Sequence, residues 1–78
     1  MRTNHADDPG AVYDAMREAA NRLLGVLVSR SDLRATGLTD ELLRAQDVRR
    51  RIRAVDLDDL DAQRKLAAEL RAERERLT

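Results

Sequence analysis

The chain has 78 residues, no cysteine, one histidine, and Tyr13 as its sole Phe, Trp or Tyr residue. The lack of cysteine excludes disulfides and cysteine-based zinc sites. Formal net charge is zero although 38% of the residues are charged, so the overall positive field of a dedicated nucleic-acid-binding protein is missing. The longest apolar run, Val26 to Val28, is far shorter than the ~20 residues that span a membrane. We therefore expect a cytoplasmic protein without a membrane span.

The first predicted element is a helix over residues 9–30. The segment before it, residues 1–8, is polar and lacks apolar periodicity, which predicts a disordered N-terminus. Asp8 followed by Pro9 is typical of a helix start, because Asp caps the free N–H groups and Pro already has helical φ. Apolar residues then recur at three- and four-residue spacing on one face, namely Val12, Met16, Ala19, Leu23 and Val26.

A second helix is predicted over residues 40–54. Gly37 marks the end of the preceding turn, and Thr39 is placed to cap a new helix. Asp40 and Glu41 fall in the first turn, where their negative charges interact favourably with the positive end of the helix dipole. The apolar face continues through Leu42, Ala45, Val48 and Ile52.

A third helix is predicted over residues 57–76. No Gly or Pro occurs after Gly37, so one continuous helix over 40–77 is the alternative. If the second helix continued, its helical spacing would place Asp59 on the apolar face. This favours a break in the helix before Asp59. Asp56 resembles a new helix cap, and a tight turn is therefore expected there.

Together these patterns predict a single all-α domain over residues 9–77, with the second and third helices forming a C-terminal hairpin. A core of this size contributes only about 3–5 kcal/mol of net stability. The chain has no disulfide or metal to add to it. We therefore expect self-association or a protein partner to complete the fold.

The apolar faces of two helices are the predicted docking surface. The third helix has a narrow apolar seam of the kind that packs against another helix. The residues expected to bind a partner are Leu66, Leu70 and Leu77 on the third helix and Leu23 and Leu27 on the first. The favoured function is a non-enzymatic protein interaction module, a small regulatory or adaptor subunit such as an antitoxin-type inhibitor, an adaptor or an assembly factor.

A basic run at the end of the second helix supports a different hypothesis. Arginine side chains can neutralise phosphates and read base edges, and the candidates here are Arg44, Arg49, Arg50 and Arg53. On this alternative the protein is a dimeric nucleic-acid-binding regulator. Asp47 lies within the run, and acidic residues follow over 56–61. An internally compensated, solvated face is therefore the preferred interpretation.

No sequence pattern indicates an enzyme. A nucleophile paired with a base, a metal-ligand cluster and a glycine-rich phosphate loop are all missing from the sequence. The acidic segment 56–61 lacks the glycine and the distal glutamate of an EF-hand loop. We expect no catalytic residue, cofactor, metal site or small-molecule substrate.

Overall fold

Three α-helices make up most of the chain that the structure describes, residues 8–31 and 39–78. In this computed structural model they are α1 (Pro9–Arg30), α2 (Asp40–Ala54) and α3 (Leu60–Leu77), and the described residues contain no strand. The predicted all-α, three-helix fold class is confirmed. The disorder predicted for the N-terminus falls on residues 1–7, outside the described residues, except at Asp8.

Side-chain caps fix the ends of α1 and α2. The Asp8 carboxylate accepts a hydrogen bond from the Gly10 N–H at 2.9 Å, and Pro9 is the first helical residue. At the other end, the Ser31 hydroxyl lies 2.9 Å from the hydroxyl of Thr39, which itself caps α2 by accepting from the Leu42 N–H. The C-terminus of α1 and the N-terminus of α2 are thereby tied together.

The turn between α2 and α3 differs from the prediction. Helix α3 begins at Leu60 rather than Leu57, with Asp59 as its cap. The reason is that the Asp56 side chain forms a hydrogen bond within the turn and does not cap the helix. Its Oδ1 atom accepts from the Asp58 N–H at 2.8 Å, a local bond typical of Asp in turns. This turn is longer than the predicted one and leaves the side chain of Leu57 exposed.

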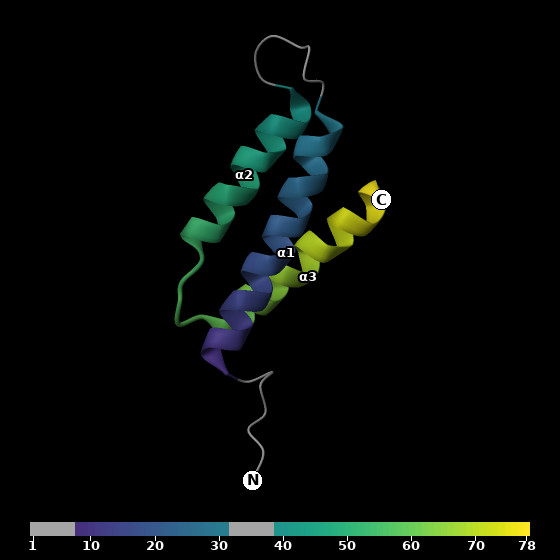
Figure 1. Ribbon diagram of the computed structural model, residues 1–78. Helices are drawn as coiled ribbons and strands as arrows, with labels where there is room; N and C mark the ends of the chain where they lie inside the picture. The colour runs from purple at the N-terminus through teal and green to yellow at the C-terminus, as the bar shows by residue number, and fades with distance from the viewer. Residues whose placement is uncertain (1–7, 32–38) are drawn as a thin grey trace.

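Helix α1 is the element on which the other two pack. It contacts both α2 and α3, whereas those two helices reach each other through long side chains. Figure 1 shows α2 running beside α1 in the opposite direction and α3 crossing α1 at an angle. The C-terminal hairpin thus has splayed arms, and its turn lies at the end of the molecule where α1 begins.

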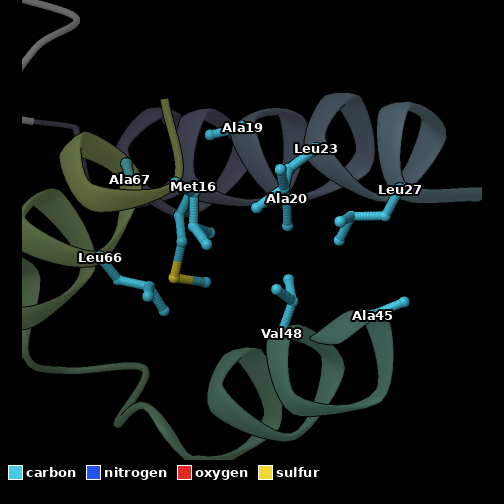
Figure 2. Packing of buried hydrophobic residues seen from close by; sticks show 10 residues of the cluster. Met16, Ala19, Ala20, Leu23, Leu27, Ala45, Val48, Leu66 and Ala67 are labelled. Atoms are coloured by element: carbon cyan, nitrogen blue, oxygen red, sulfur yellow. The ribbon is translucent and has the colours of Figure 1, made fainter. Parts of the chain in front are cut away.

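The core lies where α1 meets the other helices. Figure 2 shows the side chains of α1 pointing toward Val48 and Ala45 of α2 and Leu66 of α3. The best-buried apolar side chains, each with 0% exposure, come from all three helices. They are Met16, Leu23, Val48 and Leu70. The apolar faces predicted for the helices are therefore satisfied, in part, within one chain.

Gln63 is the one polar side chain buried in the described part of the chain. Its Nε2 atom donates to the backbone carbonyls of Asp56 at 3.0 Å and Leu57 at 2.9 Å, while its Oε1 atom has no partner. The amide ties the turn to the first turns of α3. Gln63 therefore lies in the apolar seam because its side chain hydrogen-bonds the backbone of the turn.

Candidate functional site: an arginine groove between two helices

The basic run of α2 divides between two faces of the helix. Arg44 and Arg51 are seven residues apart, which puts them on one side two turns from each other. That side faces α3. Arg49 and Arg53 are four residues apart and share another side, next to α1. These four arginines therefore form two separate groups of cations on different faces of α2.

The group facing α3 is neutralised by carboxylates. Arg44 binds Glu73 at two points, with 2.9 Å from Nε to Oε2 and 2.5 Å from Nη2 to Oε1, and it also contacts Asp47. Arg51 pairs with Glu69 at 2.5 Å. These two ion pairs are the link between the splayed arms of the hairpin.

The contact with Arg44 changes the pKa of Glu73. The Glu73 side chain is only 16% exposed, and the hydrogen bond from Arg44 lowers the pKa of Glu73 in spite of the opposing effect of burial. The same bond raises the pKa of Arg44. The hydrogen bond from Arg51 likewise lowers the pKa of Glu69. Folding is therefore linked to the ionisation of these carboxyls.

Replacing Glu73 by glutamine should make part of the stability insensitive to acid. A depressed pKa means that the contribution of Glu73 is fully present above its ordinary pKa of 4.5 and is lost as the pH falls through the lowered value. Glu73→Gln should cost about 1 kcal/mol at neutral pH and nothing in strong acid. Urea unfolding across the acid range measures this difference. Glu75→Gln, at an exposed position of the same helix, is the control, and an equal pH-dependent loss there would contradict the account.

Arg50 pairs with Asp47. Of the four arginines predicted to contact nucleic acid, Arg44 and Arg50 thus have carboxylate partners. The other two, Arg49 and Arg53, form no ion pair with a described residue. They are the part of the run that is available to a ligand.

Arg49 and Arg53 line a groove between α2 and α1. The α1 side contributes Arg17 and Asn21, and the base of the groove is apolar, formed by Ala20, Leu24 and Ile52. Its volume is about 200 Å³. We refer to these seven residues as the arginine groove. Its described lining contains three guanidinium groups and no carboxylate.

This arrangement favours an anionic ligand with an apolar part. The guanidinium of Arg17 lies 6.0 Å from the centre of the Tyr13 ring, which holds it by a cation–π contact. Half-buried Leu24 and Ile52 pack against the core and give the groove an apolar base beside the exposed arginines.

Protein-family models, curated proteins and solved structures show no match to this chain. No group of three or more potential metal ligands is found among residues 8–31 and 39–78. Within the same residues, no helix is long and apolar enough to cross a membrane.

The predicted docking leucines lie mainly in the core. Exposure is 0% at Leu23, 3% at Leu27, 5% at Leu66 and 0% at Leu70, and Leu77 is half-buried against the same cluster. In a single folded chain these side chains hold the helices together. Their role in binding a partner stays a prediction, and Leu77, which is half-buried, is the most accessible of the five.

The sequence interpretation missed Arg17 and the separation of the basic run into two groups. The separation was available from helical spacing, because Arg49 and Arg53 share a face that excludes Arg44. The contribution of Arg17 to the groove could not be predicted from the sequence. It depends on the antiparallel placement of α1 beside α2, which brings Arg17 next to residues far along the chain.

Proposed function

We propose that this protein is a non-enzymatic interaction module that binds an acidic, amphipathic segment of a protein partner in the arginine groove. One observation carries the proposal. Three arginines that form no ion pair with a described residue converge from two helices over an apolar base. Antitoxin-type inhibitors, adaptors and assembly factors all work by binding a protein, and the proposal applies to each of these classes.

The apolar base argues for a peptide ligand over a simple anion. Carboxylates of a partner would meet the guanidinium groups of Arg49 and Arg53, where bidentate hydrogen bonds form readily. An apolar residue of the same segment would cover Leu24 and Ile52, which are half-buried. Acidic and apolar side chains at helical spacing satisfy both requirements at once, as in other helix-in-groove complexes.

A nucleic-acid-binding regulator is the second candidate, because the same guanidinium groups can bind phosphates. It ranks lower for three reasons. Arg44, Arg50 and Arg51 are engaged by carboxylates, and the formal charge of the chain is zero. The described groove also lacks an aromatic side chain on which a base could stack.

The test is a fluorescence anisotropy titration with a labelled helical peptide of Glu and Leu residues. A scrambled peptide of the same composition serves as the ligand control. Arg49→Glu should weaken peptide binding about tenfold or more, a loss of one strong charge contact. Arg50→Glu makes the same change in charge one residue away and outside the groove, and it should have a much smaller effect.

Two outcomes would overturn the proposal. One is an equal loss of peptide affinity in Arg49→Glu and Arg50→Glu, which would mean that net charge alone matters. The other is tighter binding of a labelled DNA duplex than of the peptide, with log affinity falling against log salt at a slope near −0.9 per phosphate. That second result would favour the regulator.

A further inference from the structure

The turn between α2 and α3 is an acidic, apolar surface that the proposed function does not use. Four aspartates lie in it or at the start of α3, namely Asp56, Asp58, Asp59 and Asp61. Leu57 at its centre is 66% exposed, the highest value among the exposed large apolar side chains of the described chain. We call residues 56–61 the acidic turn.

Hydrogen bonds to the backbone hold the acidic turn in place, and carboxylates of the turn remain exposed to solvent. Asp56 and Asp59 accept hydrogen bonds from backbone N–H groups, and Gln63 binds two carbonyls of the turn from below. The Asp61 side chain is 97% exposed, although it contacts Arg64 at 3.4 Å. Asp58 is exposed as well. The surface is therefore preorganised, which lowers the entropy cost of binding.

The acidic turn and the arginine groove complement each other in two ways. The groove presents cations around an apolar base, and the turn presents anions around an exposed leucine. No ion pair among the described residues joins the turn to Arg17, Arg49 or Arg53. Within one chain, the two surfaces therefore make no direct charge contact with each other in the described residues.

Their positions allow two copies to pair symmetrically. Arg53 lies near the end of α2, directly before the acidic turn, so the cationic and anionic surfaces are adjacent at one end of the molecule (Figure 1). A twofold axis at that end would bring each turn to the groove of the other copy. Such an isologous interface is the common arrangement of homodimers.

From this complementarity we infer that the arginine groove binds the acidic turn of a second copy of this chain, with Leu57 over Leu24 and Ile52. The inference rests on the proposed function, because it names one occupant for the groove. Two copies of each contact form per dimer. The association is electrostatically assisted and weakens as salt rises.

A charge-swap experiment tests it with the full chain. One variant carries Arg49→Glu and Arg53→Glu, and the other carries Asp58→Lys and Asp61→Lys, which leaves the capping aspartates intact. Sedimentation velocity should show a concentration-dependent dimer for the natural sequence, and at least about tenfold weaker association for each variant alone. Their equimolar mixture should associate again, since both interfaces of the mixed dimer are then complementary. Arg50→Glu should associate like the natural sequence.

Leu57→Ser adds a test at an exposed position where loss of folding is not expected. It should weaken association without changing the far-ultraviolet circular dichroism. A natural sequence that stays monomeric, or folded variants whose mixture does not associate, would overturn the inference. If Arg49→Glu still weakens peptide binding more than Arg50→Glu does in that case, the proposed function stands with another partner. If it does not, the proposed function fails separately.

Discussion

Leu70→Ala is expected to remove about 2–5 kcal/mol from the free energy of unfolding. Leu70 has 0% exposure and lies in the cluster that joins α3 to α1, so truncation leaves a cavity that the neighbouring helices can fill only in part. A domain of this size has about 3–5 kcal/mol to lose. The variant should therefore be largely unfolded in circular dichroism at room temperature.

Leu43→Ala is the matched control. Leu43 is 48% exposed, and its truncation should change stability by about 0.5 kcal/mol or less. The pair also separates two roles for the leucines of α3. If Leu70→Ala stays fully folded but no longer associates or binds a partner, the leucines form a docking seam, and their placement in the core of a single chain is wrong.

Gln63→Glu, which replaces only the side-chain amide nitrogen by oxygen, should strongly destabilise the fold at neutral pH. It replaces the buried Nε2 donor by an oxygen that faces the carbonyls of Asp56 and Leu57. Burying a carboxylate without a donor is expensive, by several kcal/mol. The protein can reduce this cost by keeping the new carboxyl protonated, which raises its pKa in the folded state.

The pH dependence of this variant has a definite sign. A raised pKa in the folded state means that the cost is full above that pKa and disappears below the unfolded value of about 4.3. Unfolding by urea should show the variant approaching the natural sequence as the pH falls. Gln63→Leu is the control, because it removes the same hydrogen bonds without a titrating group. A Gln63→Glu loss that does not change with pH would contradict the placement of Gln63.

The helices were predictable because their signals are local. Asp8 and Thr39 act as the caps that the sequence indicated, and apolar spacing identified the buried face of each helix. The start of α3 was not predictable in the same way. Asp56 and Asp59 are both competent caps. Asp59 caps α3 because the Asp56 side chain accepts a hydrogen bond within the turn, where Gln63 also binds two backbone carbonyls.

Only part of the candidate site could be predicted from the sequence. Arg49 and Arg53 belong to the basic run that the sequence marked. Asp47, which neutralises Arg50, lies within that run, but the partners of Arg44 and Arg51 on α3 do not. Glu73 and Glu69 reach Arg44 and Arg51 only because the hairpin folds back. Which arginines are left without a partner is therefore a property of the tertiary structure.

The leucine faces illustrate an ambiguity that sequence alone leaves open. An apolar seam on a helix can pack inside its own chain or against another one, since both bury the same spacing of residues. Here α1 covers the seam of α3, so Leu66 and Leu70 are buried without a partner. The arginine groove, by contrast, is lined mainly by exposed polar and half-buried apolar residues, a pattern that resembles an ordinary solvated face.

The most direct test of the central claim is to map the binding surface by nuclear magnetic resonance. The nitrogen-15-labelled protein is titrated with the acidic amphipathic peptide, and the amide and arginine Nε–H signals are followed. The account predicts that the largest shifts occur at Arg17, Asn21, Arg49 and Arg53, with α3 little changed. Shifts centred on Glu69, Glu73 and Leu77 of α3, or loss of signals throughout the core, would contradict it.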